Sequence, residues 1–227
     1  MDGTGELFSP FVAALPKSFE TVIVRYPTDQ CLSYQELEGL VRAACPTSEP
    51  YILLAESFST PLAMRFAATH PENLAGIVLC AGFASSPATG LRRLLGRLLA
   101  PILFHLPLPS FAMKFWLVGP DASSSLVKTV KSAVSTVRPR VLATRMSAVL
   151  KCEARADLTR IEVPILYLQA TGDRLVSSSC VEEIRQIRPQ VKIEAIEAPH
   201  LILQRQPHRA AEVVAEFARS CFAAPTT

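Results

Sequence analysis

Glycine, aromatic residues and histidine are scarce in this sequence, and it has no metal-binding pattern. Of the 227 residues, 9 are glycine, 7% are aromatic and 4 are histidine. The six cysteines form no C-x-x-C pair and do not alternate with histidines at the spacing of zinc ligands. They are Cys31, Cys45, Cys80, Cys152, Cys180 and Cys221. We therefore expect reduced thiols in a cytoplasmic protein that needs neither a metal nor an organic cofactor.

The sequence also lacks a strong charge of either sign and a long uninterrupted apolar run. The net charge is +3 and the basic residues are scattered, which does not predict a nucleic-acid partner. Charged residues and prolines interrupt the longest apolar tract, residues 94–118, whereas a membrane span needs roughly 20 mostly apolar residues. The opening residues, MDGTGELF, are polar and unlike a secretory signal. We expect no transmembrane segment.

What the sequence does contain is an alternation of apolar runs and amphipathic segments. At 49% hydrophobic, a chain of this length can bury the core of one domain. Ser33 and Glu36 form a capping box that predicts a helix running to residue 44. Strands are expected at residues 19–25, 51–55, 74–81, 163–169 and 191–196, and further helices at 6–15, 59–69, 177–187 and 207–222. Strands and helices in alternation predict an α/β fold with a mostly parallel sheet covered on both faces.

Between residues 84 and 155 no strand of the same quality appears. An insertion in an α/β protein lies over the carboxyl ends of the strands, where ligands bind. We therefore predict a core made of residues 1–83 and 156–227 and a helical cap made of residues 84–155.

The turn at Ser57 is the first candidate site. The sequence YILLAESFS predicts a buried strand followed at once by a helix. A serine on such a turn exposes its hydroxyl at the carboxyl end of the sheet, where the helix N-terminus favours negative charge. The usual pattern is G-x-S-x-G, and here Ala55 and Ser59 replace both glycines. Taken alone, the pentapeptide also fits a serine that only caps the helix.

Two further polar residues fall at the same edge of the predicted sheet. Asp173 comes after the strand at 163–169, and His200 comes after the strand at 191–196. Serine, aspartate and histidine in this chain order resemble the α/β-hydrolase superfamily over nearly the whole chain. The resemblance implies that Ser57 is the nucleophile, that His200 is the general base and acid, and that Asp173 orients His200. It also implies the backbone N–H of Phe58 as one oxyanion donor.

Other residues could fill these roles. Asp157 is the main rival acid, but it precedes a strand and would lie at the opposite edge. Glu194 and Glu197 are close to His200 in sequence and fit exposed charges at a strand end. A structural role is the simpler interpretation of the remaining histidines, which are His70, His105 and His208.

The start of the chain departs from the superfamily pattern. There, a strand ending in a glycine-containing turn lies between the strands that here read 19–25 and 51–55, and it supplies the second oxyanion N–H. The opening MDGTGELF resembles the segment immediately after that strand, but the strand itself is absent. Either the chain begins at an internal methionine of a longer protein, or the sheet closes without the strand. The first alternative is our expectation, with Met1 at the donor position and activity restored in a longer form.

The cap should determine the substrate. Its apolar residues suggest an acyl-chain pocket, with Leu99, Leu103, Phe111 and Trp116 as substrate-binding candidates, although packing onto the sheet also explains them. We expect a small-molecule ester or thioester with a short to medium acyl chain. A basic edge at residues 92–97 could dock an acidic carrier protein. Acyl transfer by the same residues, or a non-catalytic binding protein of the same fold, are the alternatives.

Overall fold

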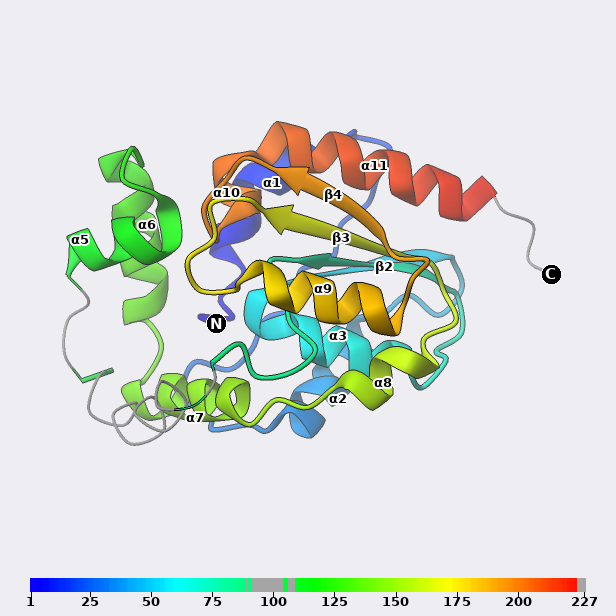
Figure 1. The fold of residues 1–227 in the computed structure, drawn as a ribbon, viewed down its shortest axis with the longest axis horizontal. Coiled ribbons are helices and arrows are strands. Elements are labelled where there is room, and N and C mark those ends of the chain that lie inside the picture. The colour runs from blue at the N-terminus through cyan, green and yellow to red at the C-terminus, as the bar shows by residue number, and fades with distance from the viewer. Residues whose placement is uncertain (89, 91–103, 106–108, 224–227) are drawn as a thin grey trace.

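A computed structural model describes residues 1–88, 90, 104–105 and 109–223. Its centre is a parallel sheet whose spatial order, β1-β2-β3-β4, is also the chain order (Figure 1). The strands are β1 (Tyr51–Glu56), β2 (Leu74–Cys80), β3 (Ile165–Ala170) and β4 (Lys192–Ile196). All three ladders are parallel, which confirms the predicted sheet type.

Helices connect and cover these strands. They are η1 (Glu6–Phe8), α1 (Ser9–Ala14), α2 (Tyr34–Ala44), η2 (Ser57–Ser59), α3 (Thr60–Ala67), α5 (Ser110–Met113), η3 (Lys114–Val118), α6 (Ser124–Ser135), α7 (Pro139–Leu150), α8 (Arg155–Arg160), α9 (Ser178–Ile187), α10 (Ile202–Arg205) and α11 (Pro207–Ala223). The predicted capping box is present, since the Ser33 amide donates to Glu36 Oε2 at 2.7 Å and the Glu36 amide donates to Ser33 Oγ at 3.3 Å.

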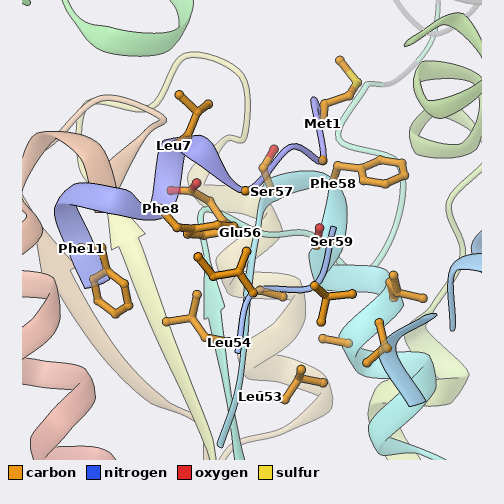
Figure 2. A pocket seen from close by; sticks show the side chains of 18 of the residues that line it. Met1, Leu7, Phe8, Phe11, Leu53, Leu54, Glu56, Ser57, Phe58 and Ser59 are labelled. Atoms are coloured by element: carbon orange, nitrogen blue, oxygen red, sulfur yellow. The ribbon is translucent and has the colours of Figure 1, made fainter. Parts of the chain in front are cut away.

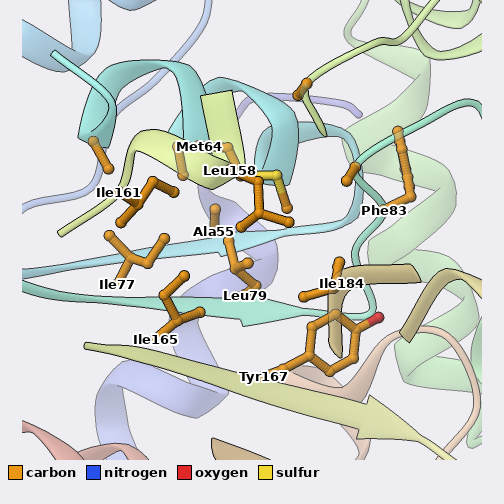
Figure 3. Close-up of a cluster of buried hydrophobic side chains, with 14 of the residues drawn as sticks. Ala55, Met64, Ile77, Leu79, Phe83, Leu158, Ile161, Ile165, Tyr167 and Ile184 are labelled. Carbon is orange, nitrogen blue, oxygen red and sulfur yellow. The ribbon is translucent and has the colours of Figure 1, made fainter. Parts of the chain in front are cut away.

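Side chains of the central strands alternate between two cores. Ile77 and Leu79 of β2 pack with residues of α3, α8 and α9 on one face (Figure 3). Val78 and Cys80 point to the opposite face and pack with residues of α1 and α11. Because successive side chains of a strand point to opposite faces, a continuous apolar run such as LAGIVLC requires cover on both sides. This arrangement explains why β2 and β3 are almost fully buried.

The strand predicted at residues 19–25 is wrong. These residues are extended, but they join no ladder in the described part of the chain, and Val22 is 62% exposed. A strand needs a neighbour, and no described residues lie in the sheet between this segment and β1. The amide of Tyr26 instead donates to the carbonyl oxygen of Gly3 at 2.8 Å. Strand β1 and residues 19–25 therefore do not pair with each other across the position where the superfamily pattern has a further strand.

Residues 84–155 leave the sheet and come back to it. At their two ends, the Ala154 amide donates to the Ala84 carbonyl at 2.7 Å, and Ser85 forms an isolated antiparallel bridge with Glu153. Helices α5, α6 and α7 lie beyond the ends to which the β3 and β4 arrows point (Figure 1). The insertion is thus beside the carboxyl edge of the sheet. Its assignment as a cap with these boundaries remains a proposal.

Candidate active site

Ser57 lies on a strained turn between β1 and η2. Its φ of 54° is left-handed, a conformation that residues other than glycine rarely adopt. Thr60 Oγ1 donates to the Ser57 carbonyl at 2.8 Å and accepts from the Phe83 amide at 3.2 Å. A Cβ atom at Gly82 would lie 2.6 Å from the Thr60 methyl group, so only glycine allows this approach. The segment after β2 therefore supports the serine turn directly.

Phe58, the residue after Ser57, is held firmly by its neighbours. Its ring stacks on Tyr34 with 5.0 Å between centroids, and the Tyr34 hydroxyl donates to the Phe58 carbonyl at 2.9 Å. Ser59 occupies the second glycine position, and its hydroxyl hydrogen-bonds the Tyr26 hydroxyl at 3.0 Å. The amide of Phe58 lies in the first turn of a helix, where N–H groups have no intrahelical acceptor. It remains the predicted oxyanion donor.

The structure brings Ser57, Asp173 and His200 together. Ser57 Oγ lies 2.7 Å from His200 Nε2, and His200 Nδ1 lies 2.7 Å from Asp173 Oδ2. His200 is only 3% exposed. One imidazole thus lies between a hydroxyl and a carboxylate. Its Nε2 can accept the hydroxyl proton while its Nδ1 stays hydrogen-bonded to the carboxylate.

The loop after β3 fixes the Asp173 carboxylate. Its second oxygen, Oδ1, accepts from the amides of Leu175 at 2.7 Å and Val176 at 3.0 Å. The Gly172 amide donates to the Ala198 carbonyl at 3.0 Å and so ties this loop to the loop after β4. These bonds position the acid and the histidine although 27 residues separate them in sequence.

A buried carboxyl group lies next to this set. Glu56 Oε2 accepts from Gln204 Nε2 at 3.1 Å, and Oε1 is 3.5 Å from the Leu203 amide. Burial raises the pKa of the Glu56 carboxyl, and this effect outweighs that of the hydrogen bond from Gln204. Glu56 therefore links the turn before Ser57 to the helix after His200. The sequence alone does not predict this link, because Glu56 stands at a variable position of the G-x-S-x-G turn.

The N-terminal residues are held by a buried cation that the sequence analysis missed. Arg145 of α7 is 2% exposed, and it donates to the carbonyl oxygens of Met1 at 2.8 Å, Asp2 at 2.7 Å and Pro27 at 2.9 Å. The Met1 amine lies 3.9 Å from the Asp2 carboxylate. Burial lowers the pKa of this amine. No local signal distinguishes Arg145 from the exposed basic residues of the insertion.

A cavity of about 1310 Å³ opens at these residues. Ser57, His200, Met1 and Trp116 line it, and Figure 2 shows Met1 near Ser57 and Phe58. Phe111 is 76% exposed and is not among the lining residues, so the structure does not place this substrate-binding candidate at the cavity. The other two candidates, at positions 99 and 103, lie outside the described residues.

The rival acids lie in other environments. Asp157 pairs with Arg160 at 2.6 Å and lies 3.8 Å from Arg65, and Glu194 pairs with Arg209. His70 lies 3.4 Å from Glu162.

Within the described residues there is no group of three or more potential metal ligands, and no helix is long and apolar enough to cross a membrane.

A parallel sheet with helices on both faces, and with serine, acid and histidine at its carboxyl edge, defines an α/β hydrolase fold. Residues 33–203 match the model of a hydrolase family described as "Serine aminopeptidase, S33", so the chain belongs to this family. No curated protein matches the sequence.

Solved structures share this fold at low sequence identity. A hydrolase from Oleispira antarctica has a TM-score of 0.83 at 14% identity, with 96% of this chain and 88% of that chain covered. A thermophilic esterase from Thermogutta terrifontis has a TM-score of 0.82 at 17% identity and 96% and 86% coverage. An enol-lactonase from Burkholderia xenovorans LB400 has a TM-score of 0.76 at 16% identity and 96% and 88% coverage.

Proposed function

We propose that this chain is a serine hydrolase that cleaves carboxylic esters or thioesters through an acyl-enzyme. The observation that carries the proposal is the pair of 2.7 Å contacts that joins Ser57, His200 and Asp173. The hydrolase family and the esterases among the structural neighbours support it. A serine hydroxyl alone is a poor nucleophile, and an adjacent base of this kind activates it.

In the proposed mechanism, Ser57 Oγ attacks the acyl carbonyl carbon while His200 Nε2 takes the hydroxyl proton. The resulting oxyanion is stabilised by the amide of Phe58 and by the nitrogen of Met1. Collapse of the intermediate releases the alcohol or thiol, which receives its proton from His200. Water, deprotonated by the same imidazole, then attacks the acyl-serine and releases the acid. Asp173 holds the tautomer of His200 that these steps need.

The proposed acyl pocket lies on the cap side of the cavity. Apolar residues of η3, α6 and α7 line that side, and the same cavity contains Ser57. The lining residues there are Trp116, Leu117, Val130, Val134, Leu142 and Met146. An apolar wall beside a polar reacting group suits an acyl chain bonded to a polar leaving group.

Covalent labelling tests the proposal. A fluorophosphonate probe should add once to the purified chain, as seen in its intact mass, and should not add to Ser57→Ala. Ser59→Ala removes a hydroxyl from the same turn and should keep the adduct. An adduct that persists in Ser57→Ala would contradict the assignment of the nucleophile, and a folded wild-type chain without an adduct would show that its oxyanion site is incomplete.

Substrate class needs a separate comparison, because the family description names an aminopeptidase. We expect turnover of p-nitrophenyl esters from acetate to octanoate and none of amino-acid p-nitroanilides. Turnover of the anilides in preference to the esters would overturn the ester assignment. Added methanol would produce methyl esters if the acyl-enzyme transfers to alcohols rather than to water.

A further inference from the structure

Helix η3 of the insertion (Lys114–Val118) is hydrogen-bonded to both of the loops that carry the acid and the histidine. Its five residues form a π-helical turn, which is a rare conformation in proteins. It ends at Gly119, whose φ of 88° is left-handed. Carbonyl groups in the last turn of a helix have no intrahelical donor and need other partners. Two carbonyls of η3 have such partners in the loops after β3 and β4.

The first partner is Arg174, which directly follows Asp173. Arg174 Nη1 donates to the Phe115 carbonyl at 3.4 Å, and the guanidinium carbon lies 4.0 Å from the centroid of the Phe115 ring. The hydrogen bond is long, since N–H···O distances are usually about 2.7–3.2 Å, whereas the guanidinium is well within the range of a cation–π contact. Arg174 therefore ties the acid loop to η3 mainly through the ring of Phe115.

The second partner is Leu201, which directly follows His200. The Leu201 amide donates to the Leu117 carbonyl at 3.2 Å. The residue before the histidine also meets the insertion, because a Cβ atom at Gly119 would lie 3.4 Å from Cγ of Pro199. The insertion thus contacts the chain on both sides of His200.

Trp116 lies between these two bonded residues of η3. Together with Leu117 it lines the cavity that contains Ser57. Its ring meets the Phe115 ring edge to face, with 5.0 Å between the centroids. Trp116 is 42% exposed, so an apolar ligand can bury further surface there. Adjacent residues of one short helix therefore form a wall of the cavity and hold the acid and histidine loops.

These contacts are compatible with two roles for Arg174. In the first, Arg174 only packs on Phe115, and its loss slows every ester by the same factor. In the second, η3 links the acyl chain to the acid loop, and the loss of Arg174 slows most strongly those esters whose chain reaches Trp116. The Trp116 ring, the Phe115 ring and the Arg174 guanidinium are in contact in series, which favours the second role.

We propose that η3 determines the acyl-chain specificity and that Arg174 is a positioning residue that transmits contact at Trp116 to Asp173. The inference rests on the proposed function. An acyl chain on Trp116 packs best when η3 is held against the loops after β3 and β4, so it favours that arrangement and fixes the orientation of Asp173 and His200. Binding energy from a part of the substrate that does not react is then used for orientation, which raises kcat rather than only lowering KM.

The first test measures kcat and KM for p-nitrophenyl acetate and octanoate. In the wild type, kcat for octanoate should exceed kcat for acetate by at least about tenfold. Arg174→Gln and Phe115→Leu should remove most of this difference. Arg174→Lys keeps a cation beside the ring and should retain part of it. The control is Arg185→Gln, which removes an arginine of α9 that pairs with Glu182 and should leave both rates unchanged.

An equal loss of kcat for both esters in Arg174→Gln would assign a purely structural role to this arginine and overturn the proposal. A change confined to KM would also overturn it, because the acyl chain would then bind on η3 without orienting the acid.

A second test needs no turnover, because Trp116 is the only tryptophan of the chain. In Ser57→Ala, submicellar octanoate should change the fluorescence of Trp116, whereas acetate at the same concentration should not. Octanoate should also slow hydrogen exchange by at least about tenfold at the amides of Leu175 and Val176, which donate to Asp173. Addition of Arg174→Gln should abolish this slowing, with the β3 amides as the internal control.

The fluorescence and exchange results separate this inference from the proposed function. A fluorescence change without slower exchange would contradict the role of Arg174, and the absence of both responses would contradict the role of η3. Slower exchange in a chain whose wild type turns over no ester would support the link through η3 and contradict the proposed function.

Discussion

The side chains of Glu56 and Gln204 meet in the protein interior, with Gln204 Nε2 3.1 Å from Glu56 Oε2. The contact joins the residue before Ser57 to the helix that comes after His200. The other amide atom of the glutamine, Oε1, is buried and accepts no hydrogen bond from the described residues. The hydrogen-bonding capacity of Gln204 is therefore not fully used. Substitution of Glu56 by glutamine and by alanine tests how much this contact contributes to stability.

Glu56→Gln should be neutral or stabilising, whereas Glu56→Ala should lower the free energy of unfolding by about 1–3 kcal/mol. The new amide can donate to the unpartnered Gln204 Oε1, and alanine leaves buried polar groups without partners. Urea unfolding at neutral pH measures both changes. If the two variants lost equal stability, the contact would contribute only through packing.

The pH dependence of stability should differ between the wild type and Glu56→Gln. Burial raises the folded-state pKa of Glu56 above its ordinary value of 4.5, so folding favours the protonated carboxyl. The folded chain binds more protons than the unfolded chain in the window above pH 4.5, and stability therefore falls as the pH rises through the folded-state pKa. Unfolding midpoints of the two proteins should diverge across this window, with the wild type losing relative stability. Parallel curves would show that Glu56 does not titrate on unfolding.

Asp173→Asn should lower the rate of fluorophosphonate labelling by about 10⁴-fold without unfolding the chain. An amide at this position favours the wrong tautomer of His200, and such a change causes losses of this size in serine proteases. Asp157→Asn is the matched control, because that carboxylate pairs with Arg65 and Arg160 away from the histidine. Loss of labelling in Asp157→Asn and not in Asp173→Asn would reverse our assignment of the acid.

Tyr167→Phe should cost about 1–3 kcal/mol of stability. The buried hydroxyl of Tyr167 donates to the Gly82 carbonyl at 2.8 Å and accepts from the Gly82 amide at 2.9 Å. Phenylalanine would leave both backbone groups buried without this partner, next to Thr60 and the serine turn. An unchanged thermal midpoint would mean that water replaces the hydroxyl.

Arg145→Met should release the N-terminal residues from the cavity wall. A single hydrogen bond to a charged group is worth about 1.5–3 kcal/mol, and the guanidinium makes three to carbonyl oxygens. We expect faster hydrogen exchange at the amides of residues 2–5, Tyr26 and Thr28. Arg145→Lys keeps the charge and should show a smaller effect. Unchanged exchange in Arg145→Met would show that Arg145 does not hold the N-terminal residues in place.

Much of the fold could be predicted because its signals are local. The buried strands β2 and β3 are continuous apolar runs, and the helix beginning at Tyr34 is preceded by a capping box. Residues 19–25 show the limit of such signals. Their alternation of β-branched residues fits a pleated surface, but a ladder also needs a neighbouring strand, which the segment itself does not specify.

The residues of the candidate site also fall into those that the sequence could predict and those that it could not. The positions of Ser57, Asp173 and His200 at one sheet edge result from strand order, so their meeting could be predicted. The partners of Arg145 are backbone carbonyls more than a hundred residues away in sequence, and no local pattern encodes them. The apolar side chain of Phe111 predicts a place in a pocket, but composition does not tell which way a side chain points.

The order of the sheet has a consequence for synthesis of the chain. Connections between successive strands place α3, α8 and α9 on one face, and the opposite face is covered by α1 and α11, from the two ends of the sequence (Figure 1). Val78, Leu166 and Phe217 belong to that second core. While the chain emerges from the ribosome, the part of this face that α11 covers stays exposed until that helix has been made. A nascent chain stalled before residue 207 should therefore bind chaperones that recognise apolar surface.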